Sequence, residues 1–305
     1  MLKIFAVVLL QAIAVYTLKP PVSRAVLRER MKYFDRAPRI LTGRNAHLGE
    51  HPYVVNILHE EVHLCIGSYI RQSWVLTTAQ CLRWESKDMN LTLIMGSVDL
   101  DGSGGQTRHS KVYYVHSMYN KDTSLHNIGL VQLSEAFLLS KHIEIIRLSM
   151  IPLKSQSNSS CFVSGWGSTV RDTGLEYYPK LQVSTLTLLS DDECDVLFGF
   201  FDMVPDIDKP TTRFAAGNMI CGTENGCHGE SGAPVICNRT LVGIISWNSG
   251  CDLQSPAVME PIHYNIPWME NITGSLFMLR SRASNFDDVL YGLFISLGVI
   301  LCSKT

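Results

Sequence analysis

The sequence predicts an all-β domain over residues 40–275 of the 305-residue chain. Short runs rich in β-branched and apolar residues dominate this region, and clusters of turn residues separate them at short intervals. The alternation of strand and helix patterns that βαβ units require is missing from the sequence. These observations favour an antiparallel barrel or sandwich.

Three runs carry the strand pattern most clearly. We expect strands over Tyr53–Leu58, Leu91–Met95 and Leu241–Ser246, and a turn over Asp101–Gly105. The formal net charge is −2, so the chain has no global basic field and nucleic acid is not an expected partner.

Two segments precede the predicted domain. Residues 1–17 contain Lys3 and an apolar run from Ile4 to Ala14, which predicts a secretory signal peptide; a short membrane anchor is the alternative. That run is well below the roughly 20 apolar residues that span a bilayer. Residues 18–39 hold seven Lys/Arg, two Asp/Glu and three prolines, which is typical of a solvated pro-segment or linker.

An exported chain with nine cysteines is expected to form disulfide bonds with one cysteine left over. Four sequons are also present, which fits a glycoprotein that is secreted or lies on the extracellular face of the plasma membrane. Their asparagines are Asn90, Asn158, Asn238 and Asn271.

Two motifs carry the chemistry. Trp74–Cys81 resembles the LTAAHC segment that presents the general base in chymotrypsin/trypsin-like (S1) serine proteases. Cys227–Pro234 resembles the GDSGGP segment of the same family, with Ser231 at the place of the nucleophile. In addition, Ile40–Gly43 follows Arg39 and resembles the IVGG start of an activated domain.

This resemblance implies two packed six-stranded antiparallel β-barrels and a short C-terminal helix that contains Pro267–Ile272. Proline suits the first turn of such a helix. The resemblance also implies four disulfide bonds and leaves Cys302 without a partner. The implied pairs are Cys65–Cys81, Cys161–Cys237, Cys194–Cys221 and Cys227–Cys251.

The positions that match the catalytic base and acid hold Gln80 and Asn127. A carboxamide donates and accepts hydrogen bonds but does not take a proton near neutral pH, so Ser231 lacks the group that would activate it. We therefore expect an inactive serine protease homologue, or pseudoprotease. The alternative is a serine endopeptidase with a rearranged or substrate-assisted base. His126 adjoins Asn127 and His228 lies three residues before Ser231, but in the family's geometry neither ring points at the nucleophile.

Other positions of the resemblance bear on activation. The oxyanion hole is expected from the backbone N–H groups of Gly229 and Ser231. Glu230 stands where the family has an aspartate that pairs with the new amino terminus. Cleavage after Arg39 is therefore expected to give Glu230 an ammonium partner at Ile40.

The specificity pocket also departs from the family pattern. Its floor position holds Asn225, so no negative charge selects lysine or arginine. Asn248 and Ala257 replace glycines of the pocket wall and are expected to narrow it.

Residues 276–305 form a tail with an apolar run from Val289 to Cys302. As a helix this run spans about 21 Å, less than the roughly 30 Å of a bilayer core. The tail resembles a glycosylphosphatidylinositol attachment signal, and a short membrane-spanning tail or a partner-binding amphipathic segment stay open as alternatives.

These features together predict a secreted or membrane-tethered module that binds or regulates another protein. The expected partner is a protein or glycoprotein, for example a protease or a protease inhibitor. No cofactor and no metal are expected, and a decoy for protease inhibitors is a further alternative.

Overall fold

The computed structural model describes residues 43–82, 90–152, 159–167, 179–203, 214–224, 230–247 and 256–274. All of them belong to one compact unit, residues 40–305. The predicted signal peptide, basic segment and C-terminal tail lie outside the described residues. Among the described helices, none has the length and apolarity that a membrane span requires.

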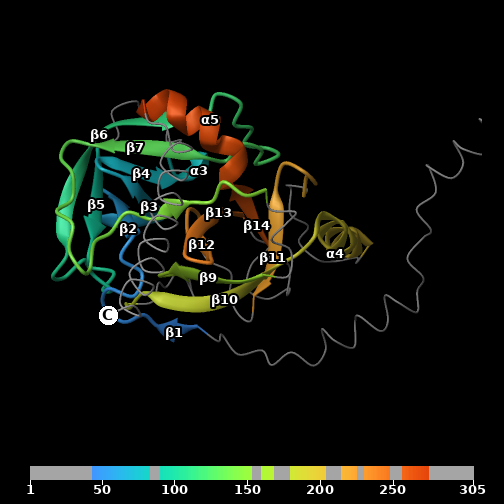
Figure 1. Ribbon diagram of the computed structural model, residues 1–305, viewed down its shortest axis with the longest axis horizontal. Coiled ribbons are helices and arrows are strands. Elements are labelled where there is room, and N and C mark those ends of the chain that lie inside the picture. The colour runs from blue at the N-terminus through green and yellow to red at the C-terminus, as the bar shows by residue number, and fades with distance from the viewer. Residues whose placement is uncertain are drawn as a thin grey trace, which may run out of the picture. The chain divides into compact units, whose positions relative to one another are not determined.

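The amino-terminal half of the domain is a closed antiparallel barrel with the strand order β2-β3-β4-β7-β6-β5 (Figure 1). Each strand pairs antiparallel with its neighbours, for example Val75 with Val131 between β4 and β7, and register shifts interrupt the β2–β3, β3–β4 and β6–β7 pairings. The strands are β2 (Val54–His59), β3 (Val62–Arg71), β4 (Trp74–Thr77), β5 (Leu91–Met95), β6 (Gln106–Val115) and β7 (Gly129–Leu133).

The carboxy-terminal half is a second six-stranded barrel, in the order β10-β11-β14-β13-β12-β9, which closes because β9 also pairs with β10. Two short strands extend it: β1 (Arg44–Asn45) pairs with β10 and β8 (Arg147–Leu148) with β13. The barrel strands are β9 (Ser160–Gly165), β10 (Gln182–Leu188), β11 (Ile220–Glu224), β12 (Pro234–Cys237), β13 (Thr240–Trp247) and β14 (Ala257–Pro261). The expected fold of two six-stranded barrels is confirmed.

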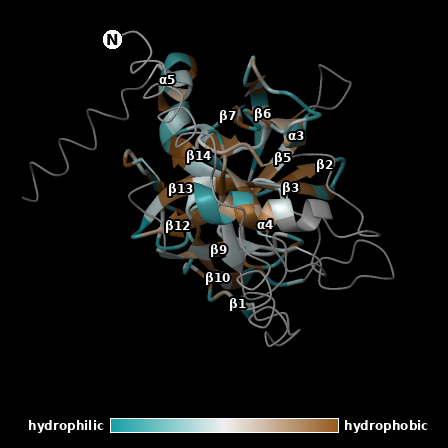
Figure 2. Cartoon of the chain, turned by 90° about the vertical axis from the view of Figure 1, so that its right-hand side faces the viewer, coloured by the Kyte–Doolittle hydropathy of each residue, from teal (hydrophilic) through white to brown (hydrophobic). Residues whose placement is uncertain are grey.

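Side-chain alternation explains why these runs form strands. In β5, Leu91, Leu93 and Met95 are buried inside the first barrel, whereas the two residues between them are partly exposed. Brown, apolar stretches follow the strands in Figure 2, while α5 (Ile262–Thr273) shows both teal and brown. The predicted turn at Asp101–Gly105 lies between β5 and β6.

One long helix, α4 (Asp191–Met203), was not predicted. Its start carries a capping box: the Ser190 backbone N–H donates to Glu193 Oε2 at 2.9 Å, and the Glu193 N–H donates to Ser190 Oγ at 3.3 Å. The acidic residues in its first turn stabilise the helix by interacting with the positive end of its dipole. The Ser-x-x-Glu pattern was therefore a readable signal for this helix.

The closing helix α5 corrects a prediction. It begins at Ile262, so Pro267 lies inside the helix and not in its first turn. Proline removes one helical hydrogen bond, but Ile262, Ile266 and Met269 recur at helical spacing and are fully buried against the second barrel. Burial of this face holds the longer helix in place, and Gly274 (φ 63°) ends it in the left-handed conformation.

Three of the implied disulfide bonds are confirmed: Cys65–Cys81, Cys161–Cys237 and Cys194–Cys221. The first ties β3 to the short helix α3 (Ala79–Leu82), and the second joins β9 to β12. The fourth implied pair, Cys227 with Cys251, falls outside the described residues, as does Cys302.

Candidate functional site

Gln80 lies on α3, directly after β4 and beside the Cys65–Cys81 bridge. Its side chain is exposed. Its backbone N–H points inward and donates to Asn127 Oδ1 at 2.9 Å. The two positions that match the base and the acid are therefore brought together, as the resemblance implies, although both side chains are neutral.

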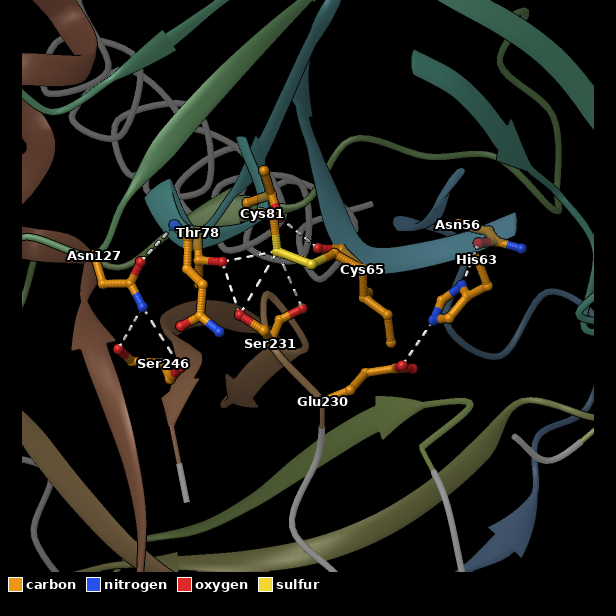
Figure 3. Close-up of a disulfide and its surroundings, with 12 residues drawn as sticks. Asn56, His63, Cys65, Thr78, Cys81, Asn127, Glu230, Ser231 and Ser246 are labelled. Atoms are coloured by element: carbon orange, nitrogen blue, oxygen red, sulfur yellow. Dashed lines mark hydrogen bonds and ion pairs between the residues drawn. A yellow bond between two sulfur atoms is a disulfide. The ribbon is translucent and has the colours of Figure 1, made fainter. Parts of the chain in front are cut away.

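Asn127 is completely buried, and its amide is hydrogen-bonded at both ends. Nδ2 donates to Ser246 Oγ at 2.8 Å, while Oδ1 accepts the Gln80 N–H (Figure 3). Because a backbone N–H only donates, these partners fix which end of the amide is oxygen. The residue keeps a rigid hydrogen-bond arrangement without carrying a charge.

Ser231 sits on a tight turn at the junction of the two barrels. Its carbonyl accepts the N–H of Ile66 on β3 at 3.2 Å, and the Gly232 N–H donates to Ile245 O on β13 at 2.9 Å. Gly232 has φ +85°, and a Cβ there would lie 2.0 Å from the Ile66 carbonyl oxygen. Only glycine permits this approach, which places Ser231 against β3.

Comparisons with known proteins agree with this geometry. The family model for trypsin matches residues 40–269. The chain belongs to the trypsin family. It is 32% identical over 225 residues to trypsin II-P29 of Gallus gallus, covering 72% of this chain and 83% of the relative. It is 26% identical over 243 residues to serine protease 1 of Homo sapiens, covering 78% and 91%.

Among solved structures, neuropsin, a serine protease expressed in the limbic system of mouse brain, superposes with a TM-score of 0.64. The match covers 77% of this chain and 100% of the neuropsin chain at 24% identity. At that identity, the likeness supports the trypsin-family fold alone.

The hydroxyl of Ser231 has a partner that the sequence analysis missed. Thr78 Oγ1 lies 2.8 Å from Ser231 Oγ, and Cys81 Sγ lies 3.6 Å from the same atom (Figure 3). Thr78 replaces the first alanine of the family's LTAAHC segment. That substitution was the signal in the sequence that could have identified it.

A buried carboxyl lies directly behind the acid position of this trypsin-family chain. Glu260 Oε2 accepts the backbone N–H of Asn127 at 3.1 Å, and Oε1 accepts Asn265 Nδ2 at 2.9 Å. Burial raises the pKa of Glu260 to about 7, although these two hydrogen bonds act in the opposite direction. A charged residue inside the otherwise apolar strand β14 was the available signal for this group.

On the other side of Ser231, Glu230 is bound by residues of both barrels. Its Oε2 lies 2.7 Å from His63 Nε2, and its Oε1 accepts the backbone N–H of Trp166 at 2.7 Å. His63 Nδ1 lies 2.6 Å from Asn56 Oδ1, and the Asn56 amide is oriented because its Nδ2 donates to the Leu100 carbonyl. His63 thus bridges Asn56 and Glu230, and its contact with Glu230 is an ion pair when both ring nitrogens carry a proton.

The other predicted site residues are placed as follows. Ala257 is buried on β14. His126, a neighbour of the acid position, stacks on His116 with ring centroids 4.7 Å apart. The predicted residues that lie outside the described residues are Arg39, Ile40, Asn225, His228, Gly229 and Asn248.

Three of the four sequon asparagines are described, and all three are exposed: Asn90, Asn238 and Asn271. Asn158 lies outside the described residues. In the described part of the chain, no group of three or more His, Cys, Asp or Glu residues could hold a metal ion.

Proposed function

We propose that this trypsin-family chain is catalytically inactive and acts by binding another protein. The observation that carries the proposal is the environment of the Ser231 hydroxyl. In the described part of the chain, its neighbours are the Thr78 hydroxyl at 2.8 Å and the Cys81 sulfur at 3.6 Å. Neither group takes a proton near neutral pH, and the exposed amide of Gln80 does not take one either.

The loss of both the base and the acid supports inactivity on energetic grounds. Removing the base from a serine protease typically lowers turnover on the order of a millionfold, or about 8 kcal/mol of barrier. Neutralising the acid at Asn127 removes the group that would hold a histidine in its reactive tautomer. What remains is a framework that can position a polypeptide without cleaving it.

The proposed site of action is extracellular, in secreted or membrane-tethered form. Three disulfide bonds support this, because such bonds persist in oxidising compartments. The proposed partner is a protein or glycoprotein, for example a protease or a protease inhibitor, bound through the surface loops between strands.

Labelling with a fluorophosphonate probe tests inactivity. The full chain is cut after Arg39 and compared with trypsin, and Ser231→Ala gives the background signal. We expect the rate of labelling for the natural chain to equal that background. Labelling of Ser231 at a rate near that of trypsin would overturn the proposal and support the alternative of a rearranged or substrate-assisted base.

Affinity capture from cell-surface extracts tests the binding function. The natural chain and Ser231→Ala are used as matched baits. We expect the same partners on both baits, because recognition through surface loops does not use the nucleophile. Partners that attach covalently, and only to the natural chain, would indicate residual acyl-transfer chemistry instead.

A further inference from the structure

Thr78 contributes a buried hydroxyl at a position where the family motif has the methyl group of alanine. The residue is completely buried, and Ser231 Oγ lies 2.8 Å from its Oγ1. A buried hydroxyl needs a hydrogen-bond partner, and here one of its two partners is the side chain at the place of the nucleophile. Neither the loss of the base nor the loss of the acid explains this contact.

The backbone fixes the distance between these two hydroxyls. Thr77 Oγ1 donates to the Ile66 carbonyl at 2.7 Å, which ties the end of β4 to β3. The Ile66 N–H donates to the Ser231 carbonyl at 3.2 Å, which ties the nucleophile turn to the same residue. The segments that carry Thr78 and Ser231 are thus both anchored to Ile66 on β3.

The proton count around Thr78 shows how the contact acts. Thr78 Oγ1 also lies 2.8 Å from Cys81 Sγ, and a sulfur in a disulfide bond can accept but not donate. When the single Thr78 proton points at this sulfur, Ser231 donates its own proton to Thr78. When Thr78 donates to Ser231 instead, it occupies an electron pair of the serine oxygen. In both arrangements the Ser231 hydroxyl is engaged by Thr78.

We propose that Thr78 is a positioning residue that holds the Ser231 hydroxyl beside the Cys65–Cys81 bridge, as a separate inactivating change. The inference rests on the proposed function, because it explains how the retained serine is kept from reacting. A base placed at position 80 competes with Thr78 for the serine proton when Ser231 donates to Thr78, and it meets a serine oxygen that already accepts a hydrogen bond when Thr78 donates to Ser231. A net hydrogen bond of ordinary strength shifts such a competition by about fivefold to tenfold.

The test uses the full chain with Gln80→His, cut after Arg39, so that a proton acceptor stands next to the serine. Thr78 is kept, changed to Ser or changed to Val in three matched proteins, and the rate of fluorophosphonate labelling is measured. We expect Thr78→Val, which keeps the shape but removes the hydroxyl, to label about fivefold to tenfold faster than the parent. Thr78→Ser keeps the hydroxyl and should label at the parent's rate.

Equal rates in the three proteins would overturn the inference. Faster labelling of both substituted proteins would also overturn it, because Thr78→Ser keeps the hydroxyl and its hydrogen bond to Ser231. The proposed function would survive either result, because it is tested on the chain that retains Gln80. The two ideas therefore fail separately.

A structural measurement decides the inference if none of the three proteins reacts. Crystal structures of the natural chain and of Thr78→Val are compared at the Ser231 side chain. We expect Ser231 Oγ to stay within hydrogen-bond distance of Thr78 in the natural chain and to rotate toward residue 80 in the variant. An unchanged Ser231 rotamer in Thr78→Val would show that Thr78 does not position it.

Discussion

The two sides of Ser231 differ in how they hold the groups of the site. On the acid side, Asn127 keeps the hydrogen bonds to Gln80 and Ser246, but the charge is gone. On the activation side, Glu230 keeps a carboxyl group, which contacts His63 Nε2 and accepts the backbone N–H of Trp166. A neutral amide can therefore hold the hydrogen-bond framework on the acid side, whereas the buried carboxyl on the activation side has partners at both of its oxygens.

The acid side also contains a buried carboxyl. This carboxyl belongs to Glu260, whose Oε2 accepts the backbone N–H of Asn127. Burial raises the pKa of Glu260, which favours its protonated form, whereas Glu230 has His63 as a partner at 2.7 Å. The two buried acids are thus accommodated in different ways.

The largest effect is expected from Gly232→Ala, because Gly232 joins the two sides. The new Cβ would lie 2.0 Å from the Ile66 carbonyl oxygen at a φ of +85°. We expect the free energy of unfolding to fall by about 4 kcal/mol or more, measured by chemical denaturation. The control is Gly274→Ala, where φ is +63° but nothing lies within 4 Å, and the expected cost is about 1 kcal/mol. Similar costs for the two variants would mean that the Ser231 turn is not fixed by β3.

The next effect concerns Glu260 and pH. Burial raises the folded-state pKa from 4.5 to about 7, so the folded chain binds more protons than the unfolded chain between these values. Stability should therefore fall as pH rises through this window, by about 3 kcal/mol in total. Glu260→Gln should remove this decline, measured as denaturation midpoints between pH 4.5 and 8. A decline of the same size in the variant would assign it to other groups.

A smaller effect is expected from Glu230→Gln. The glutamine keeps one acceptor for the backbone N–H of Trp166 but removes the carboxylate from the 2.7 Å contact with His63 Nε2. Because both side chains are largely buried, with 4% and 13% of their surface exposed, we expect a loss of about 2 kcal/mol in the free energy of unfolding. His63→Gln in the same background should then cost little more, and an additive loss would argue against direct pairing.

The smallest effect is expected from Glu50→Gln, which breaks an exposed pair. The hydrogen bond from Arg44 lowers the pKa of Glu50 from 4.5 to about 2. The pair's contribution to stability is therefore complete above the unfolded pKa of 4.5 and is lost as the pH falls from there through the folded pKa. The Arg44 side chain is 55% exposed, so solvent screening limits the loss to less than about 1 kcal/mol. A loss as large as that of Glu230→Gln would show that burial does not distinguish the two pairs.

Much of the fold could be read from local patterns. The strand at Leu91–Met95 and the turn that follows it depend on residues close in sequence, and they were predicted correctly. The extent of α5 was predicted incorrectly, because local proline preference was outweighed by burial of Ile262 and Ile266 on the barrel. Propensity is a weak signal where tertiary packing decides.

The sequence by itself determined which groups the site lacks: a proton acceptor at Gln80 and a carboxylate at Asn127. Residue identity suffices for such statements, since an amide does not become a base in any fold. Only the tertiary structure decided which groups meet. Thr78 contacts Ser231 across 153 residues, and His63 contacts Glu230 across 167. Such contacts arise from the packing of one barrel against the other, which no local pattern specifies.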